Sequence, residues 1–278
     1  MAESLTFVRA GQASGAPLVL CHGWSFNHGV WAALGAQLED EFALYLVDLP
    51  GHGGSPLGPS PHGVLPWGER VAEVAPAGAW LVGWSLGGLV ALGAALARPD
   101  AFAGVALIAS TPRFVAGADW RHGVEPAVFD GFAGHLGADT RATLRRFLAM
   151  QGLARGEQGA LARTRLRRLE EHVVSHGLAT VNGLHAGLAV LRQSDLRAQL
   201  DQRPVPVHAL FAGRDPLVRA SVATTRYFDS VAIVAEAGHA LPVSHPRAVA
   251  HWLRGCVAQG VRHPCRTPVH PGDPPLHE

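Results

Sequence analysis

The stretch AWLVGWSLGGLVALGAALA, residues 79–97, runs for nineteen positions without a charged side chain. Its length is compatible with a membrane span, because about 20 apolar residues suffice to cross a bilayer. Its glycines favour a different structure. Three of them lie within three residues of Ser85, whereas a membrane-spanning helix more commonly spreads its small residues along one face. A buried strand, a tight turn at Ser85 and a buried helix would account for the same residues.

The composition excludes several classes of protein. The chain has 278 residues, of which 48% are hydrophobic, enough for one α/β domain with an insertion. A formal net charge of +1 gives no bulk electrostatic reason to expect binding to nucleic acid or to a membrane surface. Three cysteines without a C-x-x-C pair, no H-E-x-x-H motif and no secretory signal predict a cytoplasmic protein with neither a disulfide framework nor a metal site.

Short apolar runs alternate with helical patterns in the first part of the chain. We expect strands in PLVLCHG, FALYLVD, AWLVG and GVALIAS, and helices at residues 30–38 and 86–97. Near-continuous apolar strands separated by helices are typical of a parallel sheet that is covered on both faces. The predicted fold class is therefore α/β, and residues 79–97 are interpreted as a strand, a turn and a helix.

The pattern changes in the second part of the chain. Residues 116–200 are helix-like and contain no β-branched run of strand length. Strand patterns return in VPVHALFAG and SVAIVAEAG, and a last helix is expected at 246–258. We predict one core formed by residues 1–115 and 201–259, interrupted by a helical cap at 116–200. Residues 260–278, rich in Pro, His and Gly, are predicted to be a disordered tail.

The turn around Ser85 has the pattern of a nucleophile. Residues 83–87, GWSLG, match G-x-S-x-G between an expected strand and an expected helix. Small neighbours two residues to either side allow the strand and the helix to approach closely. The turn exposes the hydroxyl, and the positive end of the following helix faces developing negative charge. The alternative is a chance glycine cluster in a buried helix, which the strand–turn–helix context disfavours.

A serine hydroxyl becomes a good nucleophile only when a base removes its proton. On this architecture the partners follow in the order Ser, acid, His. Asp215 comes directly after the strand in VPVHALFAG, and His239 follows the next strand. Both are therefore expected at the edge of the sheet where Ser85 lies and where open α/β sheets bind ligands. We predict that Ser85, Asp215 and His239 are the catalytic residues.

Other acids and histidines are weaker candidates. Asp195 and Asp229 lie near expected element boundaries and are interpreted as caps or solvated charges. His245 immediately precedes a proline and is interpreted as a helix-entry residue. His22 and His52 lie in glycine-rich turns and are expected to fix the loops by hydrogen bonding.

The oxyanion of a tetrahedral intermediate needs two donors. The backbone N–H of Leu86 follows the nucleophile at the start of a helix. The second donor is expected from the backbone N–H of Trp24, in the loop after the first strand, with its indole lining the acyl site. Ordinary core packing is the alternative role for the Trp24 side chain, and the two roles are compatible.

At these residues the chain resembles an α/β-hydrolase and, more narrowly, the pimeloyl-acyl-carrier-protein methyl ester esterases of biotin synthesis. The likeness covers about residues 17–255. Residues 56–78, rich in Pro and Gly, depart from the regular helix that the family has before its nucleophile strand. The segments that carry the likeness are LVLCHGWSFNHGVW, LYLVDLPGHGGS, GWSLGGLVA, IASTPRF, RRFLAMQ, VNGLHAGLAVLRQSDLR and AGHALPVSHP.

The resemblance implies an α/β-hydrolase fold and a serine esterase that needs no cofactor and no metal. It implies the same triad and oxyanion residues. Its substrate would be the methyl ester of pimeloyl-acyl-carrier protein, hydrolysed to methanol and pimeloyl-acyl-carrier protein. The substrate-binding residues that it implies are Trp24, Ser85, Leu86, Phe147, Leu148, Ala149, Met150, Gln151 and His239.

The resemblance also implies an acidic acyl-carrier protein as partner. A basic cap surface would meet it, with Arg146 and Arg163 at the expected carrier-facing positions. A solvated helix face in a protein whose 23 basic residues are all arginine would look similar. We expect a monomer that binds neither nucleic acid nor membrane. The competing functions are a broad carboxylesterase or C–C bond hydrolase acting on small free acids and esters, and a non-catalytic binding protein on the same scaffold.

Overall fold

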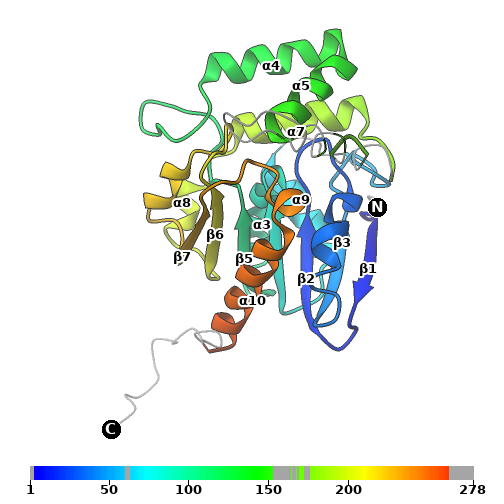
Figure 1. Ribbon diagram of the computed structural model, residues 1–278, viewed down its shortest axis with the longest axis vertical. Helices are drawn as coiled ribbons and strands as arrows, with labels where there is room; N and C mark the ends of the chain where they lie inside the picture. The colour runs from blue at the N-terminus through cyan, green and yellow to red at the C-terminus, as the bar shows by residue number, and fades with distance from the viewer. Residues whose placement is uncertain are drawn as a thin grey trace.

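A seven-stranded sheet forms the centre of the molecule (Figure 1). The computed structural model describes residues 3–59, 63–152, 164, 167, 169–171 and 176–262. The strand order is β1-β3-β2-β4-β5-β6-β7, and every neighbouring pair is parallel except β1 with β3. This arrangement confirms the predicted α/β class. The strands are β1 (Phe7–Gly11), β2 (Ala16–Cys21), β3 (Phe42–Val47), β4 (Ala79–Trp84), β5 (Phe102–Ile108), β6 (Val207–Ala212) and β7 (Ser230–Val234).

The uncharged stretch at residues 79–97 is a strand, a turn and a helix, as predicted. All six residues of β4 are buried, and α3 (Leu86–Ala97) follows directly after Ser85. The helix is apolar around its circumference because it lies between the sheet and neighbouring helices. No described helix is both long and apolar enough to cross a bilayer.

Alternate residues of β4 contribute to two separate cores. Leu81 belongs to the core that includes α3 and α2 (Val64–Val74), whereas Trp80 and Val82 belong to the core that includes α10 (Pro246–Arg262). The two-residue period of a strand places these side chains on opposite faces of the sheet. Short segments complete the second face: η1 (His28–Trp31), α1 (Ala32–Gly35) and α9 (Leu241–Ser244).

Several boundaries differ from the sequence predictions. The Pro- and Gly-rich residues 56–78 contain the regular helix α2, which accommodates Pro66 in its first turn, where a proline removes no intrahelical hydrogen bond. The helix expected at 30–38 is divided into η1 and α1 and ends at Gly35. The last helix continues to Arg262, four residues beyond the predicted end. The remainder of the predicted tail, 263–278, lies outside the described residues.

Helices between β5 and β6 form what we call the cap: α4 (Pro126–Ala138), α5 (Thr140–Gly152) and α7 (Val181–Gln193). In Figure 1 they lie above the upper edge of the sheet, where the parallel strands end. The chain re-enters the core through α8 (Arg197–Leu200), and η2 (Ala220–Thr224) follows β6. The division of the chain at residues 116 and 200 stays a prediction.

Candidate active site

Ser85 occupies a strained turn between β4 and α3. Its φ of 56° and ψ of −118° lie in a region that residues with a Cβ rarely adopt. Hydrogen bonds hold both of its peptide groups. Its N–H donates to the carbonyl of Ile108 at 3.0 Å, and its carbonyl accepts from the N–H of Gly88 at 2.9 Å and from the Ser110 hydroxyl at 2.7 Å. The surrounding structure therefore imposes the turn that directs the serine side chain away from the sheet.

Glycine is required two residues after the serine because α3 starts against the end of β2. A Cβ on Gly87 would overlap the carbonyl oxygen of Cys21 and would lie 2.6 Å from the carbonyl oxygen of His22. Real Cβ atoms do not come so close to backbone oxygens. The G-x-S-x-G spacing thus reflects close packing between a helix and a strand.

Three side chains from different parts of the chain meet at this turn. The Ser85 hydroxyl lies 2.9 Å from His239 Nε2, and His239 Nδ1 lies 2.8 Å from Asp215 Oδ2. Ser85 comes from the end of β4, Asp215 from the loop after β6 and His239 from the loop after β7. All three ends lie at the same edge of the sheet because these strands are parallel.

The Asp215 carboxylate is held on both oxygens. Oδ1 accepts from the N–H groups of Leu217 at 2.7 Å and Val218 at 3.0 Å, which leaves Oδ2 for His239. The side chains of Asp215 and His239 are inaccessible to solvent. An ionised carboxylate only accepts hydrogen bonds, so His239 carries its proton on Nδ1 and presents the Nε2 lone pair to the serine. This arrangement can take a proton from the hydroxyl and hold the resulting imidazolium beside a negative charge.

One of the two predicted oxyanion residues, Leu86, directly follows the serine in the chain. Trp24 and Leu86 are both fully buried, and Leu86 is the first residue of α3, where helix N–H groups have no acceptor within the helix. The Trp24 indole N–H donates to the carbonyl of Leu184 on α7 at 2.8 Å. A Cβ on Gly187, one turn further along α7, would lie 2.7 Å from the Trp24 ring. The cap therefore packs directly onto the predicted oxyanion loop.

Phe147, in the predicted acyl-site stretch on α5, contacts Trp24. The Phe147 ring lies 4.7 Å from the Trp24 ring, edge to face. Phe132 of α4, which the sequence analysis did not identify, completes an aromatic cluster at 5.6 Å from Trp24 and 5.3 Å from Phe147. No local motif marks Phe132, because its contact with Trp24 arises only when the cap folds over the sheet.

The other predicted substrate-binding residues of α5 differ in environment. Leu148 is buried and belongs to the core on the opposite face of the sheet, and Ala149 is half-buried. The side chains of Met150 and Gln151 lie outside the described part of the structure. Phe147 is thus the member of the stretch whose ring packs against the Trp24 indole.

The histidines of the glycine-rich turns hold loops, as expected. His22 Nε2 accepts from the N–H of Leu49 at 3.0 Å, and His52 Nδ1 donates to the carbonyl of Pro50 at 2.9 Å. Burial lowers the pKa of His22 to about 4 and that of His52 to about 3. Both imidazoles are therefore neutral at pH 7, which suits them to fixed hydrogen bonds inside the protein.

The remaining weaker candidates also have structural partners. The carbonyl of His245 accepts from the N–H of Val249 in the first turn of α10, which is the role of a helix-entry residue. Asp229 accepts from the N–H of Val207 at 2.8 Å and pairs with Arg203. Asp195 accepts from the N–H of Arg197 at 3.3 Å and pairs with its guanidinium.

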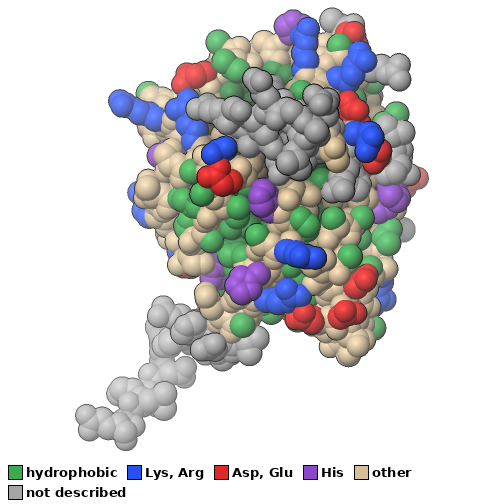
Figure 2. Space-filling view, viewed as in Figure 1, with side chains coloured by type: hydrophobic (Ala, Val, Ile, Leu, Met, Phe, Trp, Pro, Cys, Tyr) green, Lys and Arg blue, Asp and Glu red, His purple; other side chains and the backbone are tan. Residues whose placement is uncertain are grey.

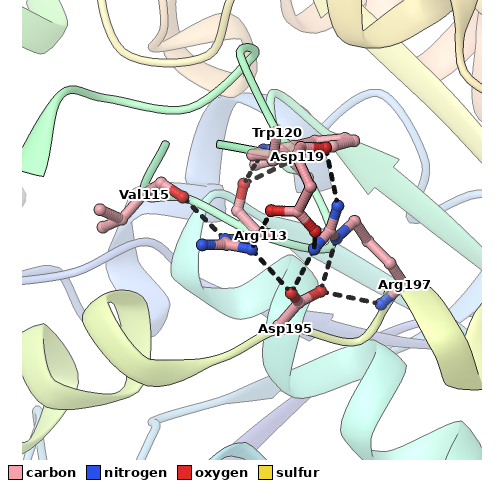
Figure 3. Close-up of polar contacts among 7 residues, drawn as sticks. Arg113, Val115, Asp119, Trp120, Asp195 and Arg197 are labelled. Carbon is pink, nitrogen blue, oxygen red and sulfur yellow. Dashed lines mark hydrogen bonds and ion pairs between the residues drawn. The ribbon is translucent and has the colours of Figure 1, made fainter. Parts of the chain in front are cut away.

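Asp195 belongs to an ion-pair network at the base of the cap (Figure 3). Arg113 follows β5 and donates to Asp195 at 3.0 Å and to Asp119 at 3.2 Å. Arg197, at the start of α8, donates to the same two carboxylates, at 2.7 and 2.6 Å, and stacks over the Trp120 ring at 5.3 Å. We call these five residues the cap-base network. It joins the segment that enters the cap to the segment that leaves it.

Metal ligands and reactive thiols do not form a second centre among the described residues. No group of three or more His, Cys, Asp or Glu side chains in the described ranges is arranged to hold a metal ion. His172 and His176 have H-x-x-x-H spacing, and His172 lies outside those ranges. Burial raises the pKa of Cys21 and of Cys256 to about 12, so both thiols stay protonated and unreactive at pH 7.

One of the two predicted carrier-facing arginines, Arg146, lies on the cap. Arg146 is exposed on α5, next to the exposed Arg145. Arg163 lies outside the described residues. Figure 2 shows basic side chains in blue beside acidic ones in red on the upper part of the molecule, where Figure 1 places the cap.

Curated relatives resemble the chain over most of its length. The alpha/beta hydrolase family matches residues 18–252. A relative from Stenotrophomonas maltophilia is 42% identical over 231 residues, which are 83% of this chain and 85% of the relative. One from Aeromonas salmonicida is 39% identical over 256 residues, 90% of this chain and 98% of the relative. Both are named pimeloyl-acyl-carrier-protein methyl ester esterase.

Solved structures share the fold. An esterase from Exiguobacterium antarcticum superposes with a TM-score of 0.79 at 19% identity, covering 91% of this chain and 95% of that one. A thermophilic esterase from Thermogutta terrifontis has a TM-score of 0.75 at 21% identity, covering 92% and 93%. The sheet order and the strained serine turn agree with the matches along the sequence. The chain therefore belongs to the alpha/beta hydrolase family and, within it, to the methyl ester esterases that its curated relatives represent.

Proposed function

We propose that this protein is a serine carboxylesterase that hydrolyses the methyl ester of pimeloyl-acyl-carrier protein in biotin biosynthesis. The observation that carries the proposal is the unbroken hydrogen-bond chain from Ser85 through His239 to Asp215. The names of the relatives supply the substrate class. No step of this chemistry requires a cofactor.

In the first step, Ser85 attacks the ester carbonyl while His239 Nε2 takes its proton. Asp215 keeps the imidazole in the required tautomer and stabilises its positive charge. The backbone N–H groups of Trp24 and Leu86 hold the tetrahedral oxyanion. Loss of one such donor costs about 2.7–4 kcal/mol of transition-state stabilisation in serine hydrolases. His239 then returns the proton to the leaving methanol.

In the second step, His239 activates water, which attacks the acyl-enzyme and releases the free carboxylate. The thioester to the carrier stays intact because the far, methyl-esterified end of the acyl chain is the part that reaches Ser85. The Trp24–Phe132–Phe147 cluster supports an apolar path for that chain between the cap and the sheet.

Replacement of the nucleophile tests the reaction. We expect Ser85→Ala to lower kcat for p-nitrophenyl butyrate by about 10⁶-fold, because the oxyanion site cannot replace the nucleophile. The circular dichroism spectrum and the unfolding midpoint should stay close to those of the parent protein. Residual turnover above a hundredth of the parent rate in a homogeneous preparation would show that Ser85 is not the nucleophile.

The carrier protein is the proposed partner because an acidic surface would be attracted to exposed arginines of the cap. Arg146→Glu should raise KM for pimeloyl-acyl-carrier-protein methyl ester and leave kcat/KM for p-nitrophenyl butyrate unchanged. Arg247→Glu is the matched control, because Arg247 is exposed on α10, which covers a face of the sheet and is not part of the cap. Equal effects of Arg146→Glu on both substrates, or none on either, would instead favour a broad carboxylesterase or a C–C bond hydrolase.

Complementation tests the pathway. Expression of the chain should restore growth without biotin to a bacterial strain that lacks its own esterase for this step, and Ser85→Ala should not. Growth with Ser85→Ala would show that complementation does not depend on ester hydrolysis.

A further inference from the structure

Trp84, the residue before the nucleophile, is hydrogen-bonded to the backbone of the predicted base. Its indole N–H donates to the carbonyl oxygen of His239 at 2.9 Å, across 155 positions of sequence. The same oxygen accepts from the N–H of Leu241 at 3.0 Å, so both of its lone pairs are used. The indole also lies against the imidazole, with 5.8 Å between ring centres.

The Trp84 side chain has little freedom to move. It is fully buried, and the ring of Phe26 lies 4.9 Å from it. A Cβ on Gly23 would already lie 3.1 Å from the indole, which shows how closely the oxyanion loop approaches. The backbone of Trp84 is paired with Ile108 at the end of β5, in the interior of the sheet. Trp84 is therefore a rigid donor mounted on the central strand.

The loop that carries His239 needs such support. His239 lies between β7, which is the edge strand, and the short helix α9. Asp215 holds the imidazole only at Nδ1. This single contact does not fix the distance between the imidazole Nε2 and the Ser85 hydroxyl. A second fixed point on the backbone of residue 239 is required to define where Nε2 lies.

We propose that Trp84 is a positioning residue that fixes the backbone of His239 and thereby sets the contact between Nε2 and the Ser85 hydroxyl. Trp84 and Ser85 are neighbours in the chain, so one strand end places both the nucleophile and the support for its base. The inference rests on the proposed function, because it assigns Trp84 a part in proton transfer between Ser85 and His239.

The chain contains a matched control for this role. Trp31 is also fully buried, and within the described residues its indole N–H has no hydrogen-bond partner. Replacement of either tryptophan by phenylalanine removes similar volume from the same core. Only Trp84→Phe removes a donor from His239.

We expect Trp84→Phe to lower kcat for p-nitrophenyl butyrate about tenfold, with KM within about twofold of the parent value. A misplacement of 1 Å in a catalytic group lowers the rate about 10²-fold. Loss of one hydrogen bond should displace the His239 imidazole by less than that, so the expected effect is smaller. Labelling of Ser85 by a fluorophosphonate should slow by a similar factor. Trp31→Phe should keep both rates, and its unfolding midpoint should fall by less than that of Trp84→Phe, because it loses side-chain volume but no hydrogen bond. An isosteric substitution of Trp84 by 3-benzothienylalanine, in which sulfur replaces the N–H, gives the same measurement if Trp84→Phe does not fold.

Equal kcat values for Trp84→Phe and Trp31→Phe, or full activity with 3-benzothienylalanine, would overturn the positioning role and leave core packing as the function of Trp84. A higher KM with unchanged kcat would also overturn it. None of these three results would affect the proposed esterase activity, which fails separately if Ser85→Ala remains active.

Discussion

At the scale of single residues, Ser85 shows how the fold maintains an unfavourable backbone conformation. A non-glycine residue at this φ costs on the order of 1–3 kcal/mol. Three hydrogen bonds to its peptide groups, from the end of β5 and the first turn of α3, offset that cost. Ala109, next to the Ile108 carbonyl that receives one of them, also has a positive φ, of 44°. Two residues with a positive φ thus directly follow the neighbouring strands β4 and β5.

Replacement of glycine by alanine should have opposite effects on stability at two positions, because the added Cβ meets backbone atoms at one and open space at the other. Gly87→Ala should lower the free energy of unfolding by about 1–3 kcal/mol or more, because the new Cβ overlaps backbone that cannot retreat without moving β2. Gly255→Ala is the control: it lies within α10 with nothing within 4 Å, and should raise the free energy of unfolding by about 0.5–1 kcal/mol. Urea unfolding measures both. A Gly87→Ala protein as stable as its parent would contradict the close-packing explanation of the motif.

At the scale of elements, the connection between β5 and β6 decides how the cap lies over the sheet. The chain leaves β5, forms α4, α5 and α7, and returns through α8 to β6. Leu196 donates its N–H to the carbonyl of Pro112 at 3.0 Å, and the residues that follow and precede this pair in the chain, Arg113 and Asp195, belong to the cap-base network. Exposed ion pairs alone are worth little, but Arg197 is only 16% exposed and serves two carboxylates and an indole.

The cap-base network predicts a local effect on cap dynamics. Arg197→Gln should increase hydrogen–deuterium exchange in residues 113–124, because the cap loses an attachment at the point where the chain leaves the core and returns to it. The same change should lower kcat/KM for long-chain esters more than for p-nitrophenyl acetate. Arg254→Gln is the control, since Arg254 makes a comparable bidentate pair with Glu41 between α10 and the segment before β3. Equal exchange in the two variants would show that the network does not anchor the cap.

Hydrogen bonding by Arg197 lowers the pKa of Asp195 and of Asp119 below the ordinary value of 3.8. A carboxylate whose pKa is lowered by folding stabilises the folded state fully when the pH is above the ordinary pKa of the group. This contribution is lost as the pH falls through the lowered pKa. The anchor of the cap should therefore persist through the neutral and mildly acidic range and weaken only below about pH 3.8.

At the scale of the whole molecule, buried neutral histidines make stability depend on pH. His22 and His52 have pKa values lowered to about 4 and about 3 by burial, against 6.5 in the unfolded chain. Below pH 6.5 the unfolded state binds protons that the folded state does not. Stability is therefore complete above pH 6.5 and falls as the pH decreases toward those lowered values.

This linkage predicts a measurable slope. In the region of pH 5, the two sites together should lower the free energy of unfolding by roughly 2.7 kcal/mol for each unit by which the pH is decreased. His52→Asn, which retains a donor for the Pro50 carbonyl, should remove about half of that slope. Urea unfolding between about pH 7 and pH 5 measures it, and an unchanged slope in His52→Asn would contradict uptake of a proton at that site.

The site illustrates how far local patterns reach. The order Ser85, Asp215, His239 was predictable because each residue comes shortly after a recognisable apolar strand, and parallel strands end at the same edge. The edge strand β1 was not predicted, since four of its five residues are exposed and an antiparallel partner leaves no crossover helix in the sequence. Helix α2 was obscured by the prolines and glycines around it, although Pro66 lies where a helix tolerates it.

The sequence by itself determined the α/β class, the serine turn and the three segments that meet there, because strand periodicity and glycine spacing are encoded over a few neighbouring residues. Only the tertiary structure decided which side chains support them. Phe132 reaches Trp24 from the cap, and the Trp84 indole reaches the His239 carbonyl across 155 positions. Such contacts depend on the packing of whole layers against one another, and no short pattern records where two distant segments will meet.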